Sequence, residues 1–402
     1  MSDLLTSSYQ LTTKILGFFE SKERQIPVYD ESPSLTTSVY QNLEAIARIL
    51  GIVPGPQRPM ATKLFEIGTD SRDYSTVTSW KDDLDGVAYT TGDDAVGECY
   101  ADSDFSSEGT LTITGGTTSG LNSVTLTAAT SDRHTGVANT GVRFLMSGSI
   151  LLSVPSGFDN KYTFEFIEVD FQGGAFKFSA VTSSAGNVGI LQNCIIHDST
   201  VATAMIEANT RDLLVRNNIV YDYTRTSGDI RGIYLDADRT SGGCFNNTVY
   251  GIVADSGTAY GIRINTNSAN GSCKNNLSMG VNGSTAGFAF SFGGTATDSD
   301  YNLSDDDTSD DGGGANNIIN ATDTNQFVSI ASRDFHLISG ADAIDSGIGP
   351  GADADIPTGD IDGDVRSGAT CDIGADEFIS AGGGSAALLA SPILKFLPNL
   401  RR

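Results

Sequence analysis

Short segments in which apolar and polar residues alternate recur along the middle of the chain at nearly constant steps. Four of them, LQNCIIHDS, VRNNIVYDY, CFNNTVYGI and CKNNLSMGV, align on an asparagine and begin at Leu191, Val215, Cys244 and Cys273. The aligned residues are 24, 29 and 29 positions apart and are Asn193, Asn217, Asn246 and Asn275. Alternation with a period of two indicates β-strands. Self-similarity at a fixed step indicates a repeat architecture.

A second set of segments keeps a similar step. RGIYLDA, YGIRINT and AGFAFSF align on Gly232, Gly261 and Gly287. Leucine-rich repeats would show leucines at fixed offsets, and propeller blades need about 40 residues each. Two short strands in a unit of 24 to 29 residues instead suit one coil of a parallel β-helix, in which coils stack about 4.8 Å apart. We therefore predict an all-β, right-handed parallel β-helix of roughly ten coils, on the order of 50 Å long, that begins near residue 100.

The recurring asparagines have a physical explanation in such a stack. An asparagine at a turn lies directly above the asparagine of the next coil, and stacked amides can form a ladder of hydrogen bonds. The predicted ladder consists of Asn193, Asn217, Asn246 and Asn275.

Both ends of a parallel stack expose unpaired strand edges that must be covered. YSTVTSWKDDLDG places Trp80 and Leu84 four residues apart, which predicts a short amphipathic helix that covers the first coil. The acidic run DSDYNLSDDDTSDDGGG from Asp298 is interpreted as a solvated loop between coils.

Residues 1–59 differ in pattern from the remainder. Apolar residues at alternating spacings of four and three predict a helix with a heptad seam at Val39, Leu43, Ile46, Leu50 and Val53. This seam either packs on its own chain or drives self-association, with a trimer as the first expectation. PGPQRP then ends the helix, because each proline fixes φ and removes a donor. We thus divide the chain into a helical adaptor with its linker (1–59), a β-helix (60–379) and a Gly-rich tether with an apolar, basic tail (380–402).

Charge sharpens this division. The net charge is −26, residues 1–59 contribute −1 and residues 380–402 contribute +3, which leaves −28 on residues 60–379. An acidic body argues against nucleic acid, whose phosphates require clustered Lys and Arg. The expected partners are other copies of the chain, other proteins contacted through residues 1–59 and 385–402, and host surface glycan.

The cysteine, histidine and hydropathy patterns limit which disulfides, metal sites and membrane segments can be expected. The five cysteines form no CxxC pair and are predicted to be buried free thiols. The histidines are scattered without metal-ligand spacing; they are His134, His197 and His336. No 18-residue apolar run exists, so no membrane span is expected. The first 24 residues place Asp3 where a secretory signal carries positive charge, so no signal peptide is expected.

The stretch DIDGDVRSGATCDIGADEF from Asp360 has the acidic and glycine content of a calcium loop. An EF-hand requires Gly at position 6 and Glu at position 12, whereas this stretch places Gly363 at position 4 and Cys371 at position 12. Two readings stay open: a set of tight turns that closes the final coil without a cofactor, or a different calcium site at Asp360, Asp362 and Asp364.

The motifs from Asp334 to Phe378 resemble those of a known family. DFHLISGADAIDSGIG followed by DIDGDVRSGATCDIGADEF resembles the C-terminal end of right-handed parallel β-helix proteins called choice-of-anchor surface proteins. The resemblance implies structural roles in the last coils for Asp345, Asp362, Arg366, Asp372 and Glu377.

A β-helical body with a helical adaptor, a docking tail and no export signal resembles bacteriophage tailspikes and head fibres or decoration proteins in plan. We expect a non-enzymatic structural protein on a virion surface, assembled in the host cytoplasm, with no catalytic residue assigned. One alternative is a β-helical polysaccharide lyase or glycoside hydrolase, whose carboxylates would come from Asp229, Asp236, Asp238 and Asp255. A further alternative is a bacterial surface adhesin.

Overall fold

The structure is a computed structural model. It describes residues 62–380 apart from 85–88, 107, 109–110, 113–119, 147–151, 155–160, 173–177, 181–188, 201–202, 209–212, 236–242, 266–271 and 294–297. The predicted adaptor with its heptad seam (Val39, Leu43, Ile46, Leu50 and Val53) and the tail 385–402 lie outside the described residues. Their roles and the domain boundaries stay predictions.

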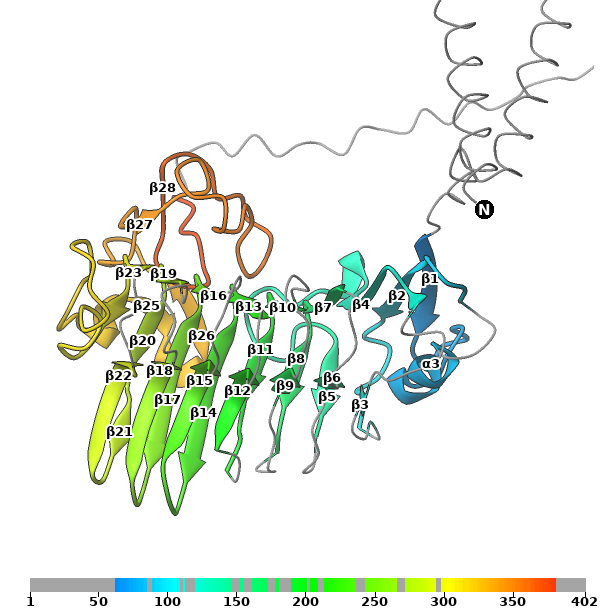
Figure 1. Cartoon of the computed structure of the whole chain (residues 1–402), viewed down its shortest axis with the longest axis horizontal. Helices are drawn as coiled ribbons and strands as arrows, with labels where there is room; N and C mark the ends of the chain where they lie inside the picture. The colour runs from blue at the N-terminus through cyan, green and yellow to red at the C-terminus, as the bar shows by residue number, and fades with distance from the viewer. Residues whose placement is uncertain are drawn as a thin grey trace, which may run out of the picture. The chain divides into compact units, whose positions relative to one another are not determined.

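Three parallel sheets form a β-helix, as predicted (Figure 1). Sheet A contains β1 (Thr62–Ile67), β2 (Asp94–Cys99), β4 (Ser123–Ala128), β7 (Lys161–Glu165), β10 (Gly189–Gln192), β13 (Leu213–Arg216), β16 (Gly243–Phe245), β19 (Ser272–Lys274) and β23 (Asp298–Asp300). Sheet B contains β5 (Arg143–Leu145), β8 (Glu168–Asp170), β11 (Ile195–His197), β14 (Ile219–Arg225), β17 (Thr248–Ala254), β20 (Leu277–Met279), β21 (Asn282–Gly283) and β24 (Leu303–Ser304). Sheet C contains β3 (Leu111–Thr112), β6 (Leu152–Val154), β9 (Phe178–Ala180), β12 (Ala204–Ala208), β15 (Ile230–Leu235), β18 (Thr258–Ile264) and β22 (Ala286–Phe292).

Each complete coil contributes one strand to each sheet. In the described part of the chain, six such sets follow one another from β4–β5–β6 to β19–β20–β22, fewer than the ten coils expected, and sheet A already starts at Thr62 rather than near residue 100. The predicted steps reappear as strand register, because Gly189 pairs with Leu213 and Cys244 with Cys273. The glycine alignment needs one correction. Gly287 pairs with Ala259 and not with Gly261.

Burial explains the apolar patterns of the strands. In sheet A, buried and half-buried residues alternate, as in the pattern of β2 and β10. In sheet B, β11 and β20 are buried at every position, because their outer face is covered as well. All five cysteines are buried and unpaired in disulfides, as predicted; four lie in the interior of the stack, and Cys371 is buried outside it.

The first coil is covered by the predicted helix. α3 (Val77–Asp83) buries Val77 and Trp80, and the indole Nε1 donates to the Tyr89 hydroxyl at 2.8 Å. The buried Glu108 carboxylate accepts the backbone N–H groups of Val77 and Thr78 at 2.7 and 2.9 Å. This contact satisfies donors that the first turn of a helix leaves unpaired.

The last coil is covered by the acidic run from Asp298, which is therefore not only a solvated loop. Asp306 and Thr308 accept hydrogen bonds from the N–H groups of Ala289 and Phe290 on β22, each at 2.8 Å. Ile318 donates its N–H to the Asn302 carbonyl at 2.8 Å, next to the edge strand β24. Polar side chains and loop backbone thus occupy an edge that would otherwise be open to strand addition.

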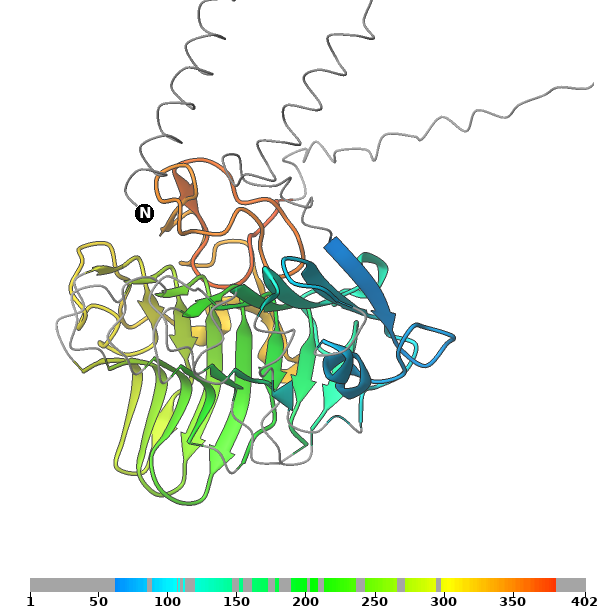
Figure 2. The same cartoon turned by 45° about the vertical axis from the view of Figure 1, so that its right-hand side comes forward.

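Residues 322–379 are called the lateral segment. They do not close the final coil, which was one of the two readings of the acidic ending. They run along the side of the stack over sheets A and B (Figures 1 and 2). They contain η3 (Asp323–Asn325), η4 (Ile330–Ser332) and two antiparallel pairs, β25 (Phe327–Ser329) with β26 (Asp334–Leu337) and β27 (Gly347–Ile348) with β28 (Thr370–Cys371); a third 3-10 turn, η2 (Thr130–Asp132), lies in the stack. Phe335 packs against Tyr221 and Tyr250 of sheet B at ring distances of 5.2 and 5.5 Å.

The asparagine ladder lies one residue later than predicted. Asn218 Nδ2 donates to Asn247 Oδ1, Asn247 Nδ2 to Asn276 Oδ1 and Asn276 Nδ2 to Asn302 Oδ1, at 2.9, 2.9 and 3.1 Å. The predicted residues Asn193, Asn217, Asn246 and Asn275 occupy the left-handed turn position, with φ between 51° and 57°. Only one hydrogen bond joins two of their side chains, from Asn275 to Asn246 at 3.3 Å.

The predicted asparagines instead hold the lateral segment. The side chain of Asn217 donates to the Gly359 carbonyl, that of Asn246 to the Asp372 carbonyl at 3.1 Å, and that of Asn275 to the Ile348 carbonyl at 2.8 Å. The second asparagine of each Asn-Asn pair (Asn218, Asn247 or Asn276) therefore joins its coil to the next one. The first (Asn217, Asn246 or Asn275) joins its coil to the lateral segment.

Candidate functional site

A polar pocket lies beside sheet B, at the ends of β8 and β11 and along β14. The pocket has a volume of about 570 Å³, and its walls are formed by Asp170, Gln172, Asp198, Ser199, Thr200, Asp222, Thr224 and Arg333. Every described residue of this wall has a polar side chain. Ligand pockets are usually mostly apolar, so this one suits a ligand rich in hydroxyl groups or a hydrated ion.

Two of its carboxylates come from equivalent positions in successive coils. Asp198 and Asp222 each follow the aligned asparagine by five residues and have φ of 61° and 52°. Gly251 and Gly280 occupy the same place in the next two coils, with φ of 68° and 66°. A left-handed position favours Gly, Asn and Asp. The aligned repeats therefore contain a signal for these two aspartates, since each follows its asparagine at the same left-handed position.

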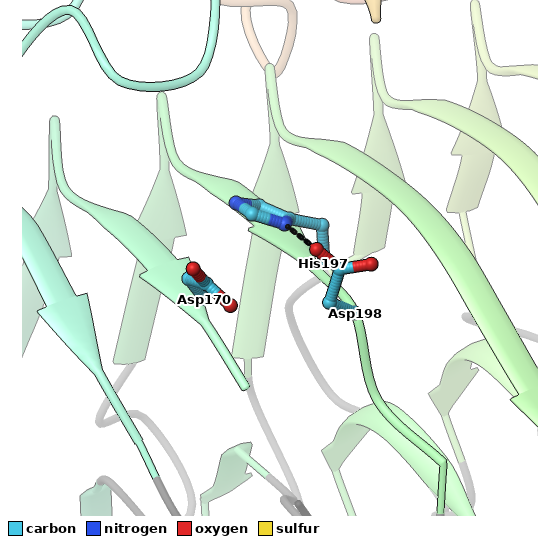
Figure 3. A group of neighbouring side chains, drawn as sticks. All are labelled: Asp170, His197 and Asp198. Atoms are coloured by element: carbon cyan, nitrogen blue, oxygen red, sulfur yellow. Dashed lines mark hydrogen bonds and ion pairs between the residues drawn. The ribbon is translucent and has the colours of Figure 1, made fainter. Parts of the chain in front are cut away.

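His197 links the pocket to a buried acid. Its Nδ1 lies 2.9 Å from Asp198 Oδ2, and its Nε2 lies 3.0 Å from Glu168 Oε1, whose side chain is fully buried. Figure 3 shows His197 and Asp198 in contact, with Asp170 facing them from the neighbouring strand. Burial lowers the pKa of His197, but the hydrogen bonds to Asp198 and Glu168 outweigh burial and raise it to about 9. The imidazole is therefore protonated at neutral pH.

The lateral segment supplies the other cation. Arg333, which adopts left-handed backbone just before β26, donates from Nε to Asp222 Oδ2. Burial raises the pKa of Asp222 although Arg333 opposes the shift. By contrast, the hydrogen bond from His197 lowers the pKa of Asp198. The two aspartates thus differ in proton affinity although they occupy equivalent positions.

The contacts among these side chains do not favour binding of a metal ion. Asp170, His197 and Asp198 offer atoms within 4.8 Å of one another, which is compatible with a shared ligand. However, both nitrogens of His197 already contact carboxylates, and binding a metal would break one of these contacts. A ligand with several hydroxyl groups needs no such change, because the carboxylates, Ser199, Thr200 and Thr224 all offer hydrogen bonds.

The predicted calcium candidates Asp360, Asp362 and Asp364 do lie together, with oxygens within 4.8 Å of one another. Asp360 is buried, and its Oδ1 accepts the N–H groups of Asp362, Gly363 and Asp364 at 3.2, 2.9 and 2.7 Å. Its Oδ2 accepts the N–H of Glu377 at 2.9 Å. These bonds give Asp360 a structural role in the turn. Calcium binding here stays a prediction.

The other predicted residues fall into separate places. Asp229 and Asp255 are exposed in adjacent turns between sheets B and C, and Asp229 accepts the N–H of Thr258 at 2.9 Å. Asp236 and Asp238 lie outside the described residues. His134 is buried with Nε2 2.8 Å from the Asn193 carbonyl, and His336 Nδ1 lies 2.6 Å from Asp334. Asp229, Asp255, His134 and His336 do not line the polar pocket.

The residues implied by the family resemblance are structural, but at the side of the stack. Arg366 is fully buried and donates to the carbonyls of Asp372 and Gly374 and to the Glu377 carboxylate, at distances between 2.9 and 3.0 Å. Asp372 accepts the N–H of Asp345 at 2.7 Å. Asp362 lies 3.5 Å from His336 Nε2.

Among the described residues, no helix has both the length and the apolar character needed to cross a membrane. A comparison with protein-family models finds no match for this chain, and a search of curated proteins finds none either.

Proposed function

We propose that this chain is a non-enzymatic structural protein of a bacteriophage virion, displayed on the particle surface, and that its polar pocket binds host surface glycan. The observation that carries the proposal is a hydroxyl- and carboxylate-lined pocket built across three coils of a stacked β-helix. Because adjacent coils are held in register by backbone hydrogen bonds, the pocket is pre-organised and needs little ordering on binding.

The pocket chemistry favours a neutral sugar. The pocket wall carries three carboxylates, from Asp170, Asp198 and Asp222, and one cation, Arg333. The remaining negative charge repels an acidic sugar, whereas hydroxyl groups can donate to the carboxylates. The place on the virion rests on analogy of architecture with tailspikes and head fibres.

Glycoside hydrolysis at the same pocket is a second candidate, favoured by one observation. The pKa of Asp198 is lowered and that of Asp222 is raised. Glycosidases use two carboxyl groups with opposite protonation, one as acid and one as base or nucleophile. Here Asp222, the residue whose pKa is raised, is already paired with Arg333. This pairing stabilises the ionised carboxylate and works against its use as an acid.

The test combines binding and turnover on a panel of host surface glycans. The whole protein is expected to bind at least one neutral glycan, with Asp222→Asn weakening binding about tenfold because a charge-assisted hydrogen bond is lost. Reducing-end and unsaturated-uronate assays are expected to show no product. Turnover that disappears in Asp198→Asn would overturn the non-enzymatic proposal in favour of the hydrolase. The genes that flank this one are expected to encode capsid or tail proteins, and their absence would overturn the virion assignment.

A further inference from the structure

The outer face of sheet C carries a regular array of aromatic and arginine side chains. Strand register places Arg231, Tyr260 and Phe288 in one row across β15, β18 and β22. It places Tyr234, Arg263 and Ser291 in a second row. All six are half-buried, while their neighbours Ile233, Ile262 and Phe290 belong to the interior core. These six residues are called the sheet C platform.

Cations and rings alternate on the platform. The guanidinium of Arg231 lies 4.7 Å from the ring centre of Tyr234, and that of Arg263 lies 4.6 Å from the ring centre of Tyr260. Tyr260 and Phe288 stack with ring centres 5.7 Å apart and planes inclined by 18°. The rings hold the guanidinium groups against the sheet through cation–π contacts.

The arginines of the platform differ from four others in the described part of the chain and resemble Arg133, whose guanidinium lies over the Phe166 ring and whose Nε is also buried without a partner. Arg72, Arg143, Arg333 and Arg366 each pair with a carboxylate. Arg231 and Arg263 form no ion pair with any described carboxylate, and the Nε of each is buried without a hydrogen-bond partner. In a chain with 50 acidic and 24 basic residues, acidic partners are abundant. Two adjacent guanidinium groups to which no described carboxylate offers an ion pair are therefore complementary to an anion from outside.

We propose that the sheet C platform binds an acidic polysaccharide in which carboxylated sugars are separated by neutral sugars. Arginine pairs with carboxylates through a planar fork of donors. The apolar faces of sugar rings pack on exposed tyrosine and phenylalanine rings. The platform extends over three successive coils about 4.8 Å apart, which suits an extended polymer more than a compact ligand.

The net negative charge of the protein is the reason to expect a ligand that carries few charges. Residues 60–379 carry −28, so a densely charged polymer is repelled by the body as a whole. Nucleic acid, with one phosphate charge per about 1.7 Å of duplex, would need many more cations than the platform offers. Isolated carboxylates meet the platform arginines at close range, whereas charges more than about 8 Å away are largely screened at physiological salt.

This inference extends the proposed glycan binding to a second surface and uses none of the pocket residues. The two can therefore fail separately. Loss of neutral-glycan binding in Asp222→Asn, together with unchanged hyaluronan binding in the platform variants, would support the pocket and overturn the platform. Unchanged neutral-glycan binding in Asp222→Asn, together with weakened hyaluronan binding in the platform variants, would support the platform alone.

The sharpest test adds the carboxylate that Arg263 lacks. Ser291 pairs with Arg263 across the sheet, so Ser291→Glu is expected to form an ion pair that occupies the guanidinium while the strand stays folded. With hyaluronan fragments as the probe, in which glucuronate alternates with a neutral sugar, Ser291→Glu should weaken binding at least about tenfold. The matched neutral variant Ser291→Gln should bind as the unaltered protein does.

Further variants separate ring, charge and general effects. Tyr260→Ala and Arg263→Gln should each weaken hyaluronan binding, whereas Lys81→Gln, which removes a charge from α3 at the other end of the stack, should not. Circular dichroism and thermal melting verify that each variant is folded. Equal affinity in Ser291→Glu and Ser291→Gln would overturn the proposal. So would a Ser291→Glu variant that weakens the binding of dextran as much as that of hyaluronan, or equal binding of polyglutamate or oligo(dT), which would indicate a general anion surface.

Discussion

At the scale of single residues, paired asparagines divide two tasks between neighbouring positions. The first of each pair adopts left-handed backbone, and its side chain points to the lateral segment where that segment is present. The second points inward, where its Oδ1 accepts both a backbone N–H and a side-chain N–H from the coil before it. A buried amide with all its hydrogen bonds satisfied stabilises the stack, while one unmatched partner would cost stability.

Replacing Asn247 by alanine should therefore destabilise the protein strongly. The change removes the acceptor of Asn218 N and Nδ2 and the donor to Asn276 Oδ1 in a buried site. We expect a loss of about 3 kcal/mol or more in the free energy of unfolding, measured by urea denaturation. Asn193→Gly is the matched control, because glycine tolerates the left-handed position and Asn193 Oδ1 has no partner among the described residues. Equal losses in both variants would contradict the ladder.

His197 should make stability depend on pH. Its pKa in the folded protein, about 9, exceeds the unfolded value of about 6.5. The protonated ring therefore stabilises the fold fully below about pH 6.5, and this contribution is lost as the pH rises through 9. The difference in unfolding free energy between the unaltered protein and His197→Gln should shrink by on the order of 3 kcal/mol between pH 6 and 10.

The comparison with His197→Gln removes the effects of other groups. His336, whose pKa is raised to about 10 chiefly by the hydrogen bond with Asp362, titrates in both proteins and cancels in the difference. A difference that stays constant or grows as the pH rises would show that the Glu168–His197–Asp198 contact does not hold a proton.

At the scale of elements, three different devices protect the sheets. α3 and Glu108 cover the first coil, Asp306 and Thr308 occupy the edge of β22, and the lateral segment covers the outer face of sheet B. Each of these elements supplies hydrogen bonds to strand or helix donors as well as apolar contact. An acidic sequence can therefore be structural, because carboxylates are good acceptors for backbone N–H groups.

The turn at residues 360–364 gives a test of this structural role. Since the oxygens of Asp360 accept four backbone N–H groups, removing calcium with EGTA should barely change the melting temperature. A drop of about ten degrees would mean that a bound ion stabilises the native state. Repeating the experiment with Asp362→Asn and with Asp198→Asn would then show whether the ion sits in this turn or in the polar pocket.

At the scale of the whole molecule, the lateral segment changes how a solenoid behaves. Stacked coils contact only their neighbours, so such proteins tend to unfold locally. Here residues 322–379 contact several coils of the stack, through Asn217, Asn246, Asn275, Thr248 and Tyr221. Long-range contacts of this kind couple coils that would otherwise be independent.

A shortened chain that begins at Met60 should stay folded, because the described core starts with β1 and is covered at that end by α3. It should keep β-rich circular dichroism and a cooperative melt. If residues 1–59 attach the acidic body to its partners, the shortened chain should lose self-association in light scattering, incorporation into particles, or both. Unfolding would place the N-terminal helix in the core. Normal assembly would instead point to residues 385–402 as the anchor.

Sequence alone was enough for the repeat, the β-helix and the helix that covers the first coil. These features depend on local patterns: alternation with a period of two, a constant step between asparagines, and the spacing of Trp80 and Leu84. The step determines the strand register, since one coil stacks directly on the next, as the pairing of Cys244 with Cys273 shows.

Tertiary structure decided which asparagine faces inward, where the lateral segment lies and which residues form the pocket. A one-residue change at a left-handed turn exchanges inward and outward side chains, and a repeat pattern fits both assignments. Arg333 meets Asp222 across 111 residues of sequence, and Asn246 meets Asp372 across 126. Contacts at such separations follow from how the chain packs against the finished stack, because no local pattern encodes which coil a returning segment will cover.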